Sequence, residues 1–345
     1  MNHLSTKAIE IGELKLNGYV YIPPMAGVTD LAYRLLCREY DPDVLLSTEM
    51  LSSRSLTYAH KKGAHHGHTK RLDIPEGDPL TGVQIFGHEP EVMAEAAQIA
   101  TDAGAKFIDI NMGCPVAKIV NGKDGAALMK EPELACDIAR AVLKATKLPV
   151  TIKTRLGWCG NSLNAAQLAR AFEDLGINAL TIHGRTREQK YSGQASWESI
   201  KEVVDAISIP VFANGDIKGL DDAIRALEVT GAQGLAIARA TMGKPWLSKQ
   251  VNHYIRTGER LEDPSPEEKL RLALRHCKLL IENKGEYIGI QESRRHVTNY
   301  TAGMTGASKL RAQIVQAKSY EEVEEAIEAY QVLLKQNLVL SHLNT

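Results

Sequence analysis

The chain has 345 residues, of which 44% are hydrophobic and 24% charged, and its formal net charge is −1. This length exceeds one small domain and suits a barrel of ~250 residues with an additional module. The even charge balance excludes a surface that is basic throughout, no apolar run reaches the ~18 residues of a membrane helix, and residues 1–20 lack a signal-peptide core.

Eight units, each a strand followed by a helix, succeed one another along the chain. The predicted strands are short, apolar and β-branched, as expected for strands buried on both faces of a sheet. They span residues 20–23, 44–48, 81–86, 107–110, 150–154, 179–183, 211–214 and 234–238. Helices are predicted to begin near Asp30 and at Pro90, and to cover Pro132–Ala145. This order indicates a parallel sheet, and eight units predict closure into a (β/α)8 TIM barrel.

The pattern changes after residue 257, where strand signals end. Ser265, Pro266 and Glu268 have the spacing of a helix N-cap, a proline at the first helical position and a capping-box glutamate. Helices are predicted over residues 267–282, 287–301 and 319–339. We therefore predict a catalytic barrel over residues 1–257 and a helical domain over residues 258–345.

Polar side chains interrupt the apolar strands, mostly at their C-terminal ends. Gln84 lies within the third strand, and the other polar residues lie at or near strand ends: Asn111, Lys153, His183 and Asn214. One such residue could be a satisfied core group. Four at the same end of successive strands are more simply explained by one shared ligand.

The loops after the last two strands have the composition of a phosphate site. Asn214, Gly215 and Asp216 follow the seventh strand, and Ala238 and Arg239 follow the eighth. Barrels often hold a phosphate with these loops, where backbone amides and an arginine can face the anion. The chain has neither a dinucleotide-binding glycine motif nor a P-loop, so we expect a phosphorylated cofactor held by the barrel itself.

A lysine buried at a strand end needs a negative partner, and this applies to Lys153. A reduced flavin carries negative charge near the N1–O2 edge of its ring, and Gln84 and Asn111 could supply hydrogen bonds to the ring. The structural alternative is an ion pair between Lys153 and a neighbouring carboxylate in the core.

Cys114 stands in a tight Gly-Cys-Pro turn directly after the fourth strand. As a nucleophile it would need an activating base, for which His183 is available, whereas as a general acid it needs only to stay protonated. A buried structural thiol is the third reading. Cys159, after the fifth strand, is the rival thiol. The five cysteines include no C-x-x-C pair, which predicts a reduced, cytoplasmic protein without a zinc or iron–sulfur site.

Three basic stretches suggest a polyanionic substrate, although each alone is more typical of a solvated face. Residues 52–72 contain no acidic side chain, and four histidines there allow a loose metal site, a solvated loop or a phosphate contact: His60, His65, His66 and His68. The other two stretches contain Arg185 and Arg187, after the sixth strand, and Arg294, Arg295 and His296, in a C-terminal helix.

Several segments resemble the tRNA-dihydrouridine synthases, and the likeness is greatest to the bacterial B type. They are PPMAGVTD at 23–30, NMGCP at 111–115, HGRT at 183–186, ANGD at 213–216, GKPW at 243–246 and RRH at 294–296. The resemblance covers nearly the whole chain. It implies an FMN-bearing barrel with a helical tRNA-binding domain, which reduces the C5–C6 bond of particular D-loop uridines with NADPH as electron donor. We expect a cytoplasmic monomer that binds neither a metal nor a membrane.

The resemblance also implies roles for individual residues. Cys114 would be the general acid, and Asn111 would touch the flavin or the target base. The flavin ring would be contacted by Pro24, Met25, Ala26, Gln84, Asn111, Lys153 and His183. Its phosphate would be held by Asn214, Gly215, Asp216, Ala238 and Arg239. Contacts with tRNA would come from Asn111, Arg185, Arg187, Arg294, Arg295 and His296.

Two positions depart from the family pattern. Ala238 replaces a usual glycine, and Gln291 replaces a usual basic residue three positions before Arg294. Two other functions remain open: a small-molecule FMN oxidoreductase of the dihydroorotate dehydrogenase type, and a non-catalytic RNA-binding protein. The sequence does not identify the target uridine.

Overall fold

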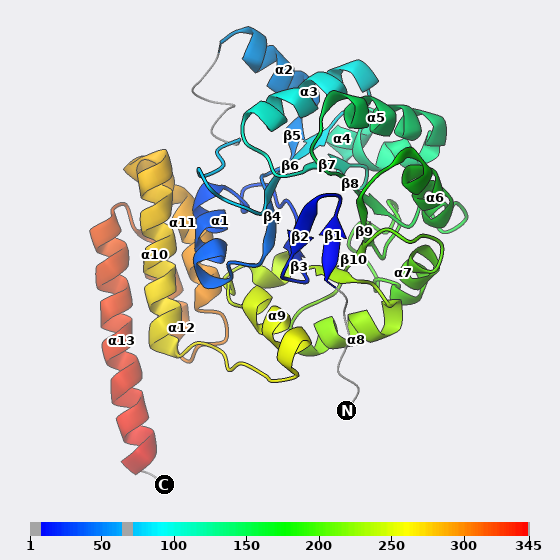
Figure 1. Ribbon diagram of the computed structural model, residues 1–345. Coiled ribbons are helices and arrows are strands. Elements are labelled where there is room, and N and C mark those ends of the chain that lie inside the picture. The colour runs from blue at the N-terminus through cyan, green and yellow to red at the C-terminus, as the bar shows by residue number, and fades with distance from the viewer. Residues whose placement is uncertain (1–7, 64–71, 344–345) are drawn as a thin grey trace.

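The computed structural model describes residues 8–63 and 72–343, with side chains as far as residue 336. Its centre is a closed barrel of eight parallel strands surrounded by helices (Figure 1), which confirms the predicted (β/α)8 barrel. The pairing between β4 and β6 closes the barrel. The strands are β3 (Val20–Ile22), β4 (Leu45–Ser47), β6 (Thr81–Phe86), β7 (Ile108–Asn111), β8 (Val150–Arg155), β9 (Ala179–His183), β10 (Val211–Asn214) and β11 (Gly234–Ala236).

Three helices around the barrel begin where the sequence signals indicate. Asp30 caps the first helix by accepting from the N–H of Tyr33 at 3.0 Å, and Pro90 and Pro132 stand at the first positions of two others. The helices are α1 (Leu31–Tyr40), α2 (Ser53–Lys61), α3 (Pro90–Asp102), α4 (Ala117–Asn121), α5 (Pro132–Ala145), α6 (Ala165–Leu175), α7 (Trp197–Val204), α8 (Leu220–Thr230) and α9 (Leu247–Thr257). Their apolar faces and the strands form the largest hydrophobic core.

Some short elements were not predicted. β1 (Ile9–Ile11) and β2 (Leu14–Leu16) form an antiparallel hairpin whose apolar residues pack on Tyr21, Phe107 and Phe212 at the amino-terminal end of the barrel. This hairpin closes the end of the barrel opposite to the candidate site. β5 (Leu51–Ser52) pairs with the end of β6, and two short 3₁₀ helices span Gly125–Lys130 and Arg239–Thr241.

The C-terminal region consists of helices packed beside α1 (Figure 1). They are α10 (Pro266–Lys284), α11 (Glu286–Tyr300), α12 (Ala307–Gln316) and α13 (Tyr320–Leu343), of which α12 was not predicted. Ser265 caps α10 as expected, accepting from the N–H of Glu268 at 3.2 Å. These helices share a hydrophobic core with Ala32 and Leu36 of α1. The domain boundary at residue 258 stays a prediction.

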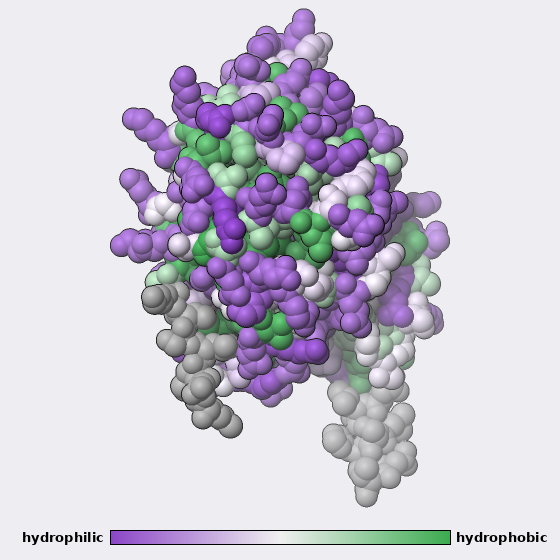
Figure 2. Space-filling model, turned by 90° about the vertical axis from the view of Figure 1, so that its right-hand side faces the viewer, coloured by the Kyte–Doolittle hydropathy of each residue, from purple (hydrophilic) through white to green (hydrophobic). Residues whose placement is uncertain are grey.

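The face of the molecule drawn in Figure 2 is mainly hydrophilic, and hydrophobic residues occur on it in small separate groups. Among the described residues, no helix has the length and apolar character needed to cross a membrane.

Candidate active site

A cavity of about 660 Å³ opens at the carboxyl ends of the barrel strands. The strand register explains why the polar strand-end residues meet there, because Asn111 lies beside Lys153 and Asn214 beside His183. The cavity is lined by Cys114, Arg295 and all the residues expected to bind the cofactor: Pro24, Met25, Ala26, Gln84, Asn111, Lys153, His183, Asn214, Gly215, Asp216, Ala238 and Arg239. The structure therefore brings together residues that are spread over more than 200 positions of the sequence.

Lys153 projects into this cavity from β8. Its ammonium group donates a hydrogen bond to Asn214 Oδ1 at 3.1 Å, and none of the described carboxylates forms an ion pair with it. Burial, reinforced by the charge of Arg155, lowers the pKa of Lys153 to about 8. The core ion pair considered as the structural alternative is therefore absent from the described part of the chain, and the cation remains available to an anionic ligand.

His183 is a neutral side chain in this environment. Burial, together with the positive charges of Lys153, Arg155 and neighbouring arginines, lowers the pKa of His183 to about 2. Its Nε2 lies 3.4 Å from Nη1 of Arg185, which can only donate. His183 Nε2 therefore accepts, and the ring proton is on Nδ1. His183 can donate to a ligand, and none of the described hydrogen bonds joins it to Cys114 as a base.

The loop after β10 offers backbone donors at the cavity. Gly215 has φ +123°, and a Cβ atom there would come within 2.7 Å of the Ala195 methyl group. Asp216 has φ +55°. Within the described chain, the N–H groups of Gly215 and Asp216 donate to no protein acceptor. Two unused amides beside the exposed Arg239 form a suitable environment for a phosphate.

The departure at Ala238 concerns a residue with φ −102° and ψ −100°, so no positive φ accounts for the usual glycine at this position.

Hydrogen bonds with two side chains, Asn111 and Arg155, fix the turn that contains Cys114. Asn111 Oδ1 accepts from the N–H groups of Gly113 at 3.1 Å and Cys114 at 2.9 Å. Arg155 Nε donates to the Gly113 carbonyl at 2.7 Å. Burial raises the pKa of the Cys114 thiol. The thiol thus stays protonated at neutral pH, which suits a general acid better than a nucleophile.

Arg185 joins the loops after β9 and β10. It is 2% exposed, and its Nη2 atom donates to both carboxylate oxygens of Asp216 at 2.9 and 2.8 Å. Although burial alone would raise the pKa of Asp216, hydrogen bonds from Ala195 and Arg185 hold that pKa below its ordinary value. Direct contact between Arg185 and tRNA would require it to leave this buried pair, so we assign it the structural role of fixing the Asp216 loop.

The three basic residues of α11 point in different directions. Arg294 donates through Nη2 to the Ala317 carbonyl at 2.7 Å, and His296 is 2% exposed, with its ring centroid 4.5 Å from that of His276. Arg295 is exposed and lines the cavity. The expected RNA contact by His296 does not fit its burial, whereas Arg295 is placed at the mouth of the site.

Arg187 belongs to a small basic group formed with Lys130 around the ring of Trp158. Its guanidinium carbon lies 4.6 Å from the ring centroid of Trp158, and the Lys130 ammonium lies 4.8 Å from that centroid. Neither cation has a carboxylate partner among the described ion pairs. We call Lys130, Trp158 and Arg187 the tryptophan platform.

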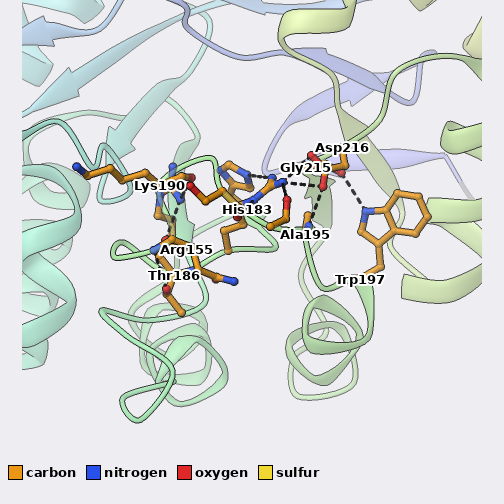
Figure 3. Close-up of polar contacts among 12 residues, drawn as sticks. Arg155, His183, Thr186, Lys190, Ala195, Trp197, Gly215 and Asp216 are labelled. Carbon is orange, nitrogen blue, oxygen red and sulfur yellow. Dashed lines mark hydrogen bonds and ion pairs between the residues drawn. The ribbon is translucent and has the colours of Figure 1, made fainter.

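Two cavity residues were not predicted as part of the site. Arg155 donates to the carbonyls of Gly113 and Thr186, and Figure 3 shows it beside Thr186 and Lys190. Tyr191 is 56% exposed, and the Arg155 and Arg239 guanidinium groups lie 5.6 and 5.2 Å from its ring centroid. The strand period of two contained a signal for Arg155, because it stands two positions after Lys153 and shares its face.

The basic stretch at 52–72 can be assessed only in part. Residues 64–71, including His65, His66 and His68, lie outside the described residues. The described residues include no group of three or more histidine, cysteine or carboxylate side chains placed to hold a metal ion.

Comparisons with known proteins agree with the fold and point to one family. Residues 21–337 match the family described as dihydrouridine synthase (Dus). The chain is 41% identical over 307 residues to a probable tRNA-dihydrouridine synthase of Rickettsia bellii, covering 89% of this chain and 92% of the relative. It is 39% identical over 323 residues to tRNA-dihydrouridine synthase B of Vibrio parahaemolyticus, covering 93% and 98%. Among solved structures, morphinone reductase in complex with tetrahydroNAD has a TM-score of 0.53 at 13% identity, covering 76% of this chain and 93% of that one.

Proposed function

Because this chain belongs to the dihydrouridine synthase family, we propose that it reduces the C5–C6 double bond of D-loop uridines in tRNA, with FMN as bound cofactor and NADPH as electron donor. The observation that carries the proposal is the meeting around one cavity of three kinds of group: a lysine without an ion pair and backbone amides without acceptors, both among the described residues, and a cysteine whose pKa is raised by burial. Each of these groups answers a different need of flavin-dependent reduction of a pyrimidine.

The cavity residues fit FMN. Lys153, which lacks a carboxylate partner among the described residues, would meet the electron-rich pyrimidine edge of the flavin ring. Neutral His183 has a ring N–H to donate. The amides of Gly215 and Asp216 and the side chain of Arg239 would hold the phosphate. The Asp216 carboxylate is directed to Arg185 instead, which limits repulsion between it and the phosphate.

In the proposed reaction, bound FMN would supply a hydride to C6 of the uracil. Cys114 holds the proton that C5 then needs, and its raised pKa keeps the thiol in the acid form. Asn111 fixes the turn that carries Cys114. Its amide group donates to Gln84 and to Met50 Sδ at 3.9 Å, and a flavin ring or a base would be a better acceptor than this weak sulfur contact. The target uridine must leave its stack to enter so recessed a cavity, as in other enzymes that modify bases.

The tRNA would lie across the carboxyl-end face of the barrel. Arg295 stands at the mouth of the cavity, and the tryptophan platform provides two further cations without acidic partners in the described chain. Such cations attract phosphates more effectively than paired ones, because no carboxylate has to be displaced first. The net charge of −1 is compatible with this arrangement since the cations are concentrated locally.

A visible absorption spectrum tests the proposal. The purified protein should be yellow, should bleach on anaerobic addition of NADPH, and should recover its colour when unmodified tRNA is added. If the bleached flavin regains its colour only when free pyrimidines are added, the substrate is a small molecule rather than tRNA. A colourless protein that does not take up added FMN would contradict the cofactor assignment.

A further inference from the structure

A continuous line of hydrogen bonds runs beneath the candidate active site, from Asp109 to the Cys114 turn. Asp109 lies on β7 with 0% exposure, and its carboxylate accepts from Gln84 Nε2 at 2.5 Å. Gln84 Oε1 accepts from Asn111 Nδ2 at 2.7 Å. Asn111 Oδ1 accepts from the N–H groups of Gly113 and Cys114. Asp109 is thus connected to the reactive turn through two side-chain amides.

The chemistry at the two ends of this line determines the direction of every bond. An ionised carboxylate can only accept, and a backbone N–H can only donate. Gln84 must therefore direct its NH₂ group to Asp109 and its oxygen to Asn111. Asn111 must in turn direct its NH₂ group to Gln84 and its oxygen to the turn. Reversal of either amide would set donor against donor or acceptor against acceptor.

Two donors outside this line hold the Asp109 carboxylate. Thr151 Oγ1 on β8 donates to Oδ1 at 2.7 Å, and the Tyr21 hydroxyl on β3 donates to Oδ2 at 3.2 Å. A buried carboxylate is costly unless it is fully hydrogen-bonded, and Asp109 meets this condition with three donors from three strands. Asp109 does not line the cavity, so contact with a ligand does not explain the cost of burying it.

We propose that Asp109 is a positioning residue, whose carboxylate fixes the conformation of the Cys114 turn through Gln84 and Asn111. The consequence for the turn follows from the hydrogen bonds alone. The consequence for proton delivery rests on the proposed function. The similarly sized change Asp109→Leu tests both, because it removes the acceptor that fixes the orientation of Gln84. Asp109→Asn would not do so, since its oxygen could still accept from Gln84 while its NH₂ group donates to Thr151 Oγ1.

Asp109→Leu removes the group that fixes the orientation of both amides. With no acceptor at position 109, Gln84 can turn its oxygen away from Asn111, Asn111 can then turn its NH₂ group toward the turn, and the N–H groups of Gly113 and Cys114 would lose their acceptor. We expect the Cys114 thiol of the purified full-length protein to react with iodoacetamide at least about fivefold faster, the equivalent of ~1 kcal/mol for one lost hydrogen bond. Peptide mass spectrometry resolves Cys114 from Cys136 and Cys159, whose rates should not change.

A second substitution, Gln84→Glu, can restore the hydrogen bonds by moving the buried carboxylate from position 109 to position 84. In Asp109→Leu combined with Gln84→Glu, the new carboxylate at position 84 can only accept from Asn111, so Asn111 regains its original orientation. The number of buried charges is conserved. The Cys114 rate should return to within about twofold of the original protein. The control is Thr151→Val, which removes a donor to Asp109 without affecting Gln84, and it should leave the Cys114 rate unchanged.

The outcomes are decisive in either case. A folded Asp109→Leu variant with the original Cys114 rate would overturn the proposal, as would a double variant in which Cys114 still reacts rapidly. If the single variant unfolds, the buried Cys37 and Cys277 will also react. The double variant then decides, because it must fold and restore the Cys114 rate. The alkylation readout is independent of tRNA, so its result stands even if the proposed reaction is wrong.

Discussion

Lys153 Nζ donates a hydrogen bond to Asn214 Oδ1 at 3.1 Å and forms no ion pair with any carboxylate in the described ranges. Among the described residues, the desolvated ammonium group thus has a hydrogen bond to a neutral partner, and the Asp109 carboxylate attracts it without forming an ion pair. Burial lowers the pKa of Lys153 to about 8, which means that the folded protein without a ligand disfavours the charge. Such an arrangement makes sense when an anionic ligand supplies the missing partner.

The first prediction concerns the stability of the protein freed of flavin. Because the pKa of Lys153 in the folded state, about 8, is below its unfolded value, the charge costs stability at all pH values below about 8, and this cost disappears as the pH rises toward ~10.4. Lys153→Met should therefore raise the free energy of unfolding at pH 7 by about 1–3 kcal/mol. Thermal unfolding at pH 7 and pH 10 measures the effect, which should be much smaller at pH 10. A lower melting temperature at pH 7 would contradict it.

The second prediction concerns Cys114 as the general acid. Cys114→Ala should retain bound flavin and its reduction by NADPH, whereas dihydrouridine formation in tRNA should fall by at least about 100-fold. Cys159→Ala is the matched control because this thiol is also half-buried on the same face of the barrel, and it should be nearly as active as the original protein. Substantial dihydrouridine formation by the Cys114 variant would remove this residue from the role.

The third prediction is a pH dependence of the same step. Burial raises the pKa of Cys114, and a general acid must be protonated, so the rate of uridine reduction should stay level through neutral pH and fall only above the ordinary thiol range. Single-turnover reduction of tRNA by the pre-reduced protein isolates this step from the NADPH reaction. A rate that decreases as the pH is lowered below 8 would instead indicate that the reaction needs the Cys114 thiolate, as the nucleophilic alternative requires.

The strand-end residues could be predicted because parallel strands of one barrel end at the same face. The observed strand pairing agrees with this rule: β7 and β8 place Asn111 next to Lys153, and β9 and β10 place His183 next to Asn214. The pair between Arg185 and Asp216 could not be predicted in this way, because it joins two loops 31 positions apart and no local pattern indicates it. The same limit applies to the hydrogen bond between Asp109 and Gln84, which depends on side-chain orientation within the barrel.

The basic cluster of α11 shows a second limit. Consecutive residues of an α-helix point about 100° apart, so Arg294, Arg295 and His296 cannot all face one ligand. The composition of the stretch predicted a basic patch, but only the packing of α11 against α1 and α10 decides that Arg295 faces the cavity and His296 the core.

The fourth prediction separates phosphate binding from ring binding. Arg239→Gln should weaken the affinity for FMN by about 10-fold or more, since one charge-assisted contact to the phosphate is lost. Riboflavin has the same ring but no phosphate, so its affinity should be unchanged in the variant. Fluorescence quenching of each flavin by the flavin-free protein measures both affinities. Equal losses for FMN and riboflavin would place Arg239 at the ring instead.

The fifth prediction concerns the tryptophan platform. Arg187 and Lys130 lie over Trp158 without acidic partners among the described ion pairs, so each should neutralise a tRNA phosphate at little cost. Arg187→Gln should weaken tRNA binding and reduce the slope of log affinity against log salt by about one, while leaving FMN affinity unchanged. Lys201→Gln is the matched control because Lys201 is paired with Asp205 on the exposed face of α7. Filter binding at several salt concentrations distinguishes the two. If Arg187→Gln leaves the salt slope unchanged, tRNA does not cross the tryptophan platform. If Arg187→Gln and Lys201→Gln lower the slope by the same amount, the effect comes from the net charge rather than from a local contact.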